Sequence, residues 1–128
     1  MTFAEKTRIP IAWTLLGIGA VDERHPLAYG YMGMHGWKHV NRAIQSADLL
    51  IALGMRFDDR VTGKVSTYAP NARIIHVDID PAEQGKVRRP DVPIVGDCRL
   101  VTEEIVKAVR EMLPMQPGDV LIIPERVF

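Results

Sequence analysis

The sequence predicts one three-layer α/β domain, with a doubly wound, Rossmann-like parallel sheet between its helices. Short apolar runs that end in turn residues alternate with segments of helical periodicity, an order typical of parallel sheets. The run Asp48–Gly54 is almost continuously apolar, as expected of a strand that helices cover on both faces. The length of 128 residues fits a single domain with a core of its own.

Four runs are predicted to form strands: Ile9–Trp13, Asp48–Gly54, Arg73–Asp78 and Val92–Gly96. Helices are predicted over Trp37–Ala47 and over Arg99–Leu113, because apolar residues recur there three and four positions apart. Asp97 is placed to cap the second helix, and a weaker helix begins at Pro81, whose ring presets the first turn. Strands and helices therefore alternate as a parallel sheet requires.

The segment after Leu113 breaks this pattern. We therefore divide the chain into a domain over residues 1–113 and a tail over residues 114–128. The tail contains a turn and one further strand candidate, Asp119–Ile123, so it is either a linker or an added edge strand.

The composition excludes several classes of function. Sixteen basic residues balance sixteen acidic ones, so nothing favours binding to nucleic acid or an anionic membrane surface. Zero net charge instead favours self-association into a homo-oligomer. The longest uncharged stretch, Ile9–Val21, is too short to span a bilayer. Cys98 is the single cysteine, so we expect a buried, inert thiol and a reducing, cytoplasmic compartment.

Polar side chains follow the predicted strands, at the edge where open α/β sheets bind ligands. After the most buried run come Arg56 and Arg60, whose planar guanidinium groups match phosphate oxygens and suit a pyrophosphate. Asp58 and Asp59 either orient those guanidiniums or contact a ribose. The alternative is a polar loop with local Arg–Asp pairs.

Asp78 ends the next strand, and three interpretations stay open for it. An acid at a strand end commonly accepts hydrogen bonds from the hydroxyls of an adenosine ribose. Equally, the strand simply ends there and Asp80 caps a helix that begins at Pro81. Asp78 and Asp80 also project to one side of an extended chain, but two carboxylates are too few for a metal site. A third strand end, Gly96–Asp97, joins a glycine to the free N–H groups of a helix start.

The segment Gly30–Gly36 precedes the first predicted helix. Its glycines let the main chain approach a flat ligand, beside soft apolar contacts from Met32 and Met34. It is not the dinucleotide fingerprint, which follows a strand directly, and His35 and His39 lack the intervening glutamate of a zinc peptidase. No catalytic set and no metal site is predicted. The residues alone thus predict an α/β domain with a nucleotide-like cleft.

Together these segments resemble the central domain of the acetolactate synthase (acetohydroxyacid synthase) large subunit, a family of thiamine-diphosphate enzymes. The resemblance covers roughly Ile9 to Val109, and its Arg-Phe-Asp-Asp-Arg-Val-Thr-Gly run is long enough to be specific. The stretches that carry it are Ile9–Gly17, Tyr31–Gly36, Ala47–Lys64, Ile75–Glu83 and Arg89–Asp97.

The resemblance implies that this domain binds FAD, which the family does not use for net redox chemistry in the carboligation. The full enzyme, a transferase, condenses pyruvate to 2-acetolactate in branched-chain amino-acid biosynthesis, with thiamine diphosphate and Mg²⁺ held between two other domains. It implies no catalytic residue in this chain. The implied FAD contacts are Thr14, Leu15, Met32, Gly33, Met34, His35, Gly54, Met55, Arg56, Asp58, Arg60, Val61, Asp78, Ile79, Gly96, Asp97 and Cys98.

The chain departs from the family pattern in two respects. Nothing in it resembles the Gly-Asp-Gly…Asn motif that holds the metal and the diphosphate, so we expect it to be noncatalytic alone. The family's central domain begins earlier, with a strand and a glycine-rich turn, whereas this sequence opens inside the following helix. That strand is normally central, and Asp119–Ile123 is predicted to insert in its place. Two other hypotheses stay open: a self-associating structural fragment without a ligand, and a homologous domain that prefers ADP.

Overall fold

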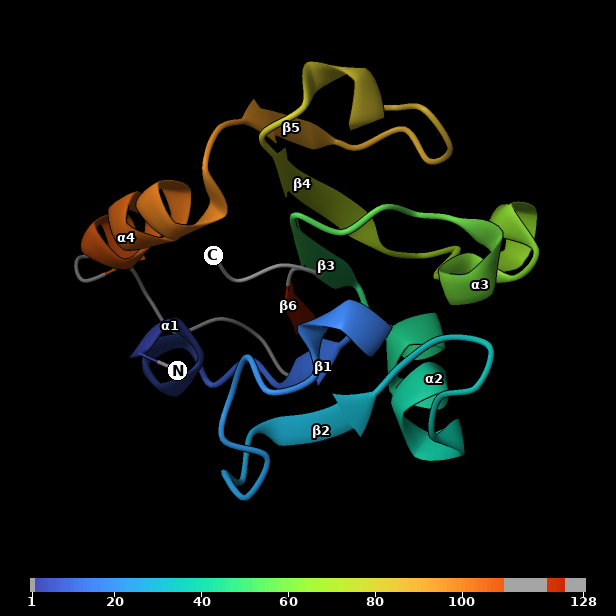
Figure 1. The fold of residues 1–128 in the computed structure, drawn as a ribbon, viewed down its shortest axis with the longest axis horizontal. Helices are drawn as coiled ribbons and strands as arrows, with labels where there is room; N and C mark the ends of the chain where they lie inside the picture. The colour runs from blue at the N-terminus through green and yellow to red at the C-terminus, as the bar shows by residue number, and fades with distance from the viewer. Residues whose placement is uncertain (1, 110–119, 124–128) are drawn as a thin grey trace.

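A computed structural model describes residues 2–109 and 120–123 of the chain. Its helices are α1 (Thr2–Thr7), α2 (Lys38–Ser46), α3 (Asp59–Thr62) and α4 (Cys98–Val109), with 3-10 turns η1 (Leu15–Gly17), η2 (Val65–Thr67) and η3 (Pro81–Glu83). Its strands are β1 (Ile11–Trp13), β2 (Ala28–Tyr31), β3 (Leu49–Leu53), β4 (Arg73–Asp78), β5 (Val92–Val95) and β6 (Val120–Ile123). The strands form one sheet in the order β2-β1-β6-β3-β4-β5, with all neighbours parallel (Figure 1).

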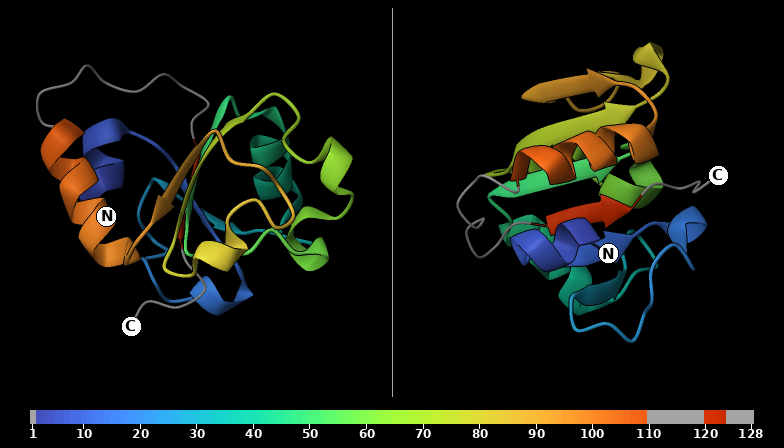
Figure 2. Two further views of the ribbon diagram at one scale, coloured as in Figure 1. Left: turned by 90° about the horizontal axis from the view of Figure 1, so that it is seen from above. Right: turned by 90° about the vertical axis from the view of Figure 1, so that its left-hand side faces the viewer.

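Helices lie on both faces of this sheet, so the predicted doubly wound α/β class is confirmed. Figure 2 shows α2 on one face and α1 with α4 on the other. In β3, Leu50 and Ala52 pack towards α2, while Ile51 and Leu53 pack towards α1 and α4. The apolar run of β3 is continuous because both faces of this strand are buried.

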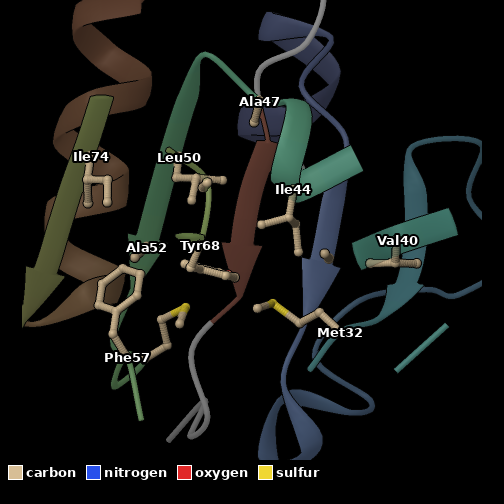
Figure 3. Packing of buried hydrophobic residues seen from close by; sticks show 12 residues of the cluster. Met32, Val40, Ile44, Ala47, Leu50, Ala52, Phe57, Tyr68 and Ile74 are labelled. Carbon is tan, nitrogen blue, oxygen red and sulfur yellow. The ribbon is translucent and has the colours of Figure 1, made fainter. Parts of the chain in front are cut away.

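The core beneath α2 forms the first of two apolar clusters (Figure 3). Val40 and Ile44 of α2, with Ala47 directly after the helix, form one stripe that packs on Leu50 of β3 and Ile74 of β4. Each fully buried leucine or isoleucine here contributes roughly 1.5–3 kcal/mol to folding. Loops at the carboxyl ends of the strands complete the cluster with Met32, Met55, Phe57 and Tyr68.

The second cluster lies between the sheet and the pair α1 and α4. Phe3 of α1 is buried there together with Ile11 and Trp13 of β1. α4 contributes a partly buried stripe of Val101, Ile105, Val106 and Val109. Among the described helices, none combines the length and the apolar character needed to cross a lipid bilayer.

The last described strand, β6, lies in the interior of the sheet. Its Leu121 pairs with Ile11 of β1 and with Ile51 of β3, and both pairings are parallel. The strand predicted over Asp119–Ile123 is thus present as Val120–Ile123, at the position between two other strands that the sequence indicates. β1 and β3 satisfy their facing backbone groups through it.

The other predicted elements agree with the structure except at Pro81, and the strand β2 was not predicted. The four predicted strands appear as β1, β3, β4 and β5, shortened at their ends, and the predicted helices appear as α2 and α4. The predicted end of the second helix at Leu113 lies outside the described residues. At Pro81 the chain makes a single 3-10 turn rather than an α-helix, with Asp80 as its side-chain cap. β2 was not predicted, because Ala-Tyr-Gly-Tyr at a sheet edge lacks an apolar run.

We expect the sheet to lose cooperative folding when β6 is removed. A chain that ends at Met115 leaves the facing ladder groups of β1 and β3 without partners, so its thermal transition should broaden or disappear. Circular dichroism melting measures this, with a chain that ends at Pro124 as the matched control because it keeps β6. An unchanged melting curve for the shorter chain would show that β6 is dispensable.

Candidate functional site

The predicted contact residues all lie in segments that leave the carboxyl ends of five parallel strands, which meet at one edge of the sheet. The structure exposes Leu15, Met34, His35, Arg56, Arg60, Ile79 and Asp97. Five of the others are half-buried: Gly54, Asp58, Val61, Gly96 and Cys98. The remaining five are buried: Thr14, Met32, Gly33, Met55 and Asp78. The edge therefore offers a ligand two arginines, several apolar side chains and a set of backbone groups.

The loop after β3 is anchored tightly to β4. Gly54 has a positive φ of 72°, and its N–H donates to the Val77 carbonyl over 2.6 Å. The next carbonyl, that of Met55, lies 2.8 Å from Nε2 of His76. Met55 and Phe57 are buried in the core on either side of the exposed Arg56. This alternation fixes the loop and directs Arg56 to the surface.

α3 (Asp59–Thr62) follows this loop, directly after Asp58. The Asp58 carboxylate accepts a hydrogen bond from the N–H of Val61 over 3.2 Å, and its carbonyl accepts the N–H of Thr62 over 2.9 Å. Asp58 is therefore a helix cap, a role that was not among the alternatives considered for it from the sequence. The side chain of Asp59 lies outside the described part of the structure.

The loop after β2 meets the loop after β3 through backbone contacts. The N–H of Met34 donates to the Arg60 carbonyl over 2.7 Å, and a Cβ on Gly33 would lie 3.0 Å from that same oxygen. The Asn41 side chain of α2 binds both the N–H of Gly33, over 3.0 Å, and its carbonyl, over 2.8 Å. Sequence reasoning missed Asn41, although a polar residue beside the buried stripe of α2 needs a partner.

Two expectations for the Gly30–Gly36 segment were wrong. A Cβ on Gly30 would lie 2.5 Å from the Trp37 ring, and one on Gly36 would lie 2.6 Å from the Met32 backbone. These glycines therefore make room for the protein itself rather than for a flat ligand. Met32 is 1% exposed in the core, so its side chain is not a soft surface contact, whereas Met34 is 63% exposed.

The acidic residues at the ends of β4 and β5 serve mainly local structure. Asp78 is buried and accepts the N–H of Asp80 over 2.9 Å, while Asp80 caps η3 through the N–H of Ala82. Asp97 accepts the N–H groups of Arg99 and Leu100, as the predicted cap of α4. Within the described residues, no group of three or more metal-ligating side chains converges.

The edge also carries an unsatisfied hydroxyl and an apolar rim. Thr14 is 2% exposed, and its Oγ1 has no hydrogen-bond partner within the described residues. Large apolar side chains are exposed in the segments that follow β1, β2 and β4, among them Leu15, Met34 and Ile79. A shallow hollow lies along α2, lined by Gly36, Lys38, Asn41, Arg42, Gln45 and Ser46.

The chain is similar to one protein family model and to several known proteins. Residues 1–105 match the family model described as thiamine pyrophosphate enzyme, central domain. The chain is 50% identical over 107 residues to the probable acetolactate synthase large subunit of Methanococcus aeolicus, a match that covers 84% of the chain and 18% of that relative. It is 55% identical over 107 residues to the acetolactate synthase of Mycobacterium avium, covering 84% of the chain and 17% of that protein.

A longer match extends towards the tail. The chain is 48% identical over 120 residues to the acetolactate synthase large subunit of Pyropia yezoensis, covering 94% of the chain and 20% of that relative. Since 120 residues exceed the 113 of the predicted domain, this match includes part of the tail. The chain spans about a fifth of the length of the curated relatives it matches.

We expect the Cys98 thiol to react slowly in the folded chain. Burial, followed by the nearby charges of Asp78 and Asp97, raises the pKa of Cys98 to about 11. At pH 8 its alkylation by iodoacetamide should be about a hundredfold slower than in denaturant, since only the thiolate reacts. The folded chain favours the protonated thiol, so the raised pKa of Cys98 contributes to the free energy of unfolding. This contribution is complete below pH 9 and is lost as the pH rises towards 11. Equal alkylation rates in the folded and denatured chain would contradict this.

Proposed function

We propose that this chain, which belongs to the thiamine pyrophosphate enzyme central-domain family, is the FAD-binding central domain of an acetolactate synthase large subunit. Support for the enzyme comes from relatives of that name, about half of whose aligned residues are identical to this chain. Support for the ligand comes from the carboxyl edge of the sheet, which is where open α/β folds bind nucleotides.

The observation that carries the proposal is the joining of two loops from different strands beside two exposed arginines. Arg56 leaves β3 on an anchored loop, and Arg60 follows on α3, whose backbone also holds Met34 from the β2 loop. Guanidinium groups at this place suit the pyrophosphate of a dinucleotide. The exposed side chains of Leu15 and Met34 provide apolar surface for a flat ring system.

Two buried polar groups also fit a dinucleotide. Thr14 presents a hydroxyl oxygen without a partner within the described residues, and such a group is costly unless a ligand or water satisfies it. Asp78 uses Oδ1 to accept the N–H of Asp80, and we assign its Oδ2, which lies 3.8 Å from Nε2 of His76, to a ribose hydroxyl. We assign both to ligand binding, with Thr14 and Asp78 held by the ends of β1 and β4.

The proposed role is to bind and orient, without catalysis by this chain alone. In acetolactate synthases, the carboligation of pyruvate depends on thiamine diphosphate and Mg²⁺. Nothing in this sequence resembles the Gly-Asp-Gly…Asn motif that holds them. We place the protein in the cytoplasm. The hypothesis of a self-associating fragment assumes that the strands beside the missing first strand are unpaired. In the structure β6 pairs with both of these strands, β1 and β3, so this ground for self-association is removed.

The test is a titration of the full chain with FAD, followed by quenching of flavin fluorescence. Wild-type chain should bind saturably, and Arg56→Ala and Arg60→Ala should each weaken binding about tenfold, the loss expected for one exposed charge-assisted hydrogen bond. Arg24→Ala is the matched control, because Arg24 is exposed on the loop that enters β2 and pairs with Asp22.

ADP serves as the competitor in the same titration. Displacement of FAD by ADP at higher concentration would show that the nucleotide half supplies part of the affinity. Tighter binding of ADP than of FAD would favour the adenine-nucleotide hypothesis instead. Absence of saturable binding by a cooperatively folded chain would refute the proposal.

A further inference from the structure

His76 is the most deeply buried ionisable side chain near the candidate site. It lies in β4 with 1% of its surface exposed, on the face of the sheet that α2 covers. Its ring stands edge-on to that of Phe57, with the ring centres 5.1 Å apart. A polar ring in an apolar strand needs a reason to be there, since burial without hydrogen bonds is costly.

That reason is a hydrogen bond to the loop after β3. Nε2 of His76 lies 2.8 Å from the Met55 carbonyl oxygen, which can only accept. The contact therefore assigns the proton to Nε2. Nδ1 is buried without a partner within the described residues, as suits the bare nitrogen of a neutral ring.

The same nitrogen also faces Asp78. His76 and Asp78 are two residues apart on β4, so their side chains leave the same face, and Oδ2 of Asp78 lies 3.8 Å from Nε2. His76 thus stands between two parts of the proposed site: the loop that carries Arg56, and the carboxylate assigned to the ribose.

The backbone of His76 is fixed as well. The Gln84 side chain donates to the His76 carbonyl over 2.9 Å and to the Ile94 carbonyl of β5 over 3.1 Å. The imidazole therefore projects from a strand whose position is set on both sides, and it can transmit that position to the loop.

We propose that His76 is a positioning residue for the dinucleotide site. Its hydrogen bond holds the Met55 carbonyl, and with it the backbone of Arg56, at a fixed distance from Asp78. Because His76 is buried, its own side chain does not touch the ligand. The inference rests on the proposed function for its ligand, but the hydrogen bond and its effect on the loop stand independently of FAD.

The test compares two substitutions in the full chain. His76→Gln places an amide nitrogen at the position of Nε2 and keeps the donor, whereas His76→Leu keeps the bulk and removes it. Ile105→Ala on α4 is the control, because it opens a cavity on the opposite face of the sheet. Each chain is measured for amide hydrogen exchange over residues 54–62 without ligand, and for FAD affinity.

We expect His76→Leu to speed exchange over residues 54–62 and to weaken FAD binding, each about tenfold, while His76→Gln stays within about twofold of wild type. For Ile105→Ala, amide exchange over residues 54–62 should change no more than the loss of global stability explains. Its FAD affinity should equal that of wild type. Equal effects of the leucine and glutamine variants would overturn the proposal. So would an unchanged loop in His76→Leu, or a changed loop with unchanged FAD affinity.

Two further arms separate this inference from the proposed function. If wild type binds no FAD, the proposed function fails, and the exchange data alone decide whether His76 holds the loop. If His76→Leu does not fold, ¹⁵N NMR of histidine-labelled wild type decides: a proton on Nε2 with bare Nδ1 is expected. A proton on Nδ1 alone would break the bond to Met55 and overturn the proposal.

Discussion

The sheet depends on β6, because no other strand in the described part of the chain joins its two halves. β2 and β1 form one half, β3, β4 and β5 form the other, and β6 pairs with β1 and β3. The apolar cluster beneath α1 and α4 draws on both halves, through Ile11 of β1 and Ile51 of β3. So does the candidate site, in which Met34 from one half contacts Arg60 from the other. A strand to which we assign no ligand contact therefore aligns the site.

Local structure and ligand binding draw on the same polar residues at this edge. Asp58, Asp80 and Asp97 all begin helical turns, and each accepts at least one backbone N–H. Their carboxylates are consequently occupied in holding the loops, which is why they look like site residues in the sequence. The side chains of Arg56 and Arg60 are exposed at the same edge, and the Thr14 hydroxyl has no hydrogen-bond partner within the described residues. These three acids therefore hold in place the loops that carry the proposed ligand-binding side chains.

The main strands were predictable because each contains a short apolar run, and Asp97 and Asp80 were predictable as caps from their places before helix starts. β2 was not, since at an edge its Ala-Tyr-Gly-Tyr shows neither an apolar run nor a helical period. The roles of Asn41 and His76 depend on partners 8 and 21 residues away, which no local pattern encodes. The glycines near β2 show the same limit, because sequence reveals the missing Cβ but not whether Trp37 or a ligand fills the space.

The place of β6 in the chain gives this topology a consequence for synthesis. Residues up to Val109 contain every other element that the structure describes, yet β1 and β3 acquire their common neighbour only when Val120–Ile123 follows. At roughly 5–20 residues per second, ribosomes add that stretch in about a second. During this interval a nascent chain presents two unpaired, apolar strand edges to its surroundings. Its helices can form on the ribosome, but its sheet closes only once translation has passed Ile123.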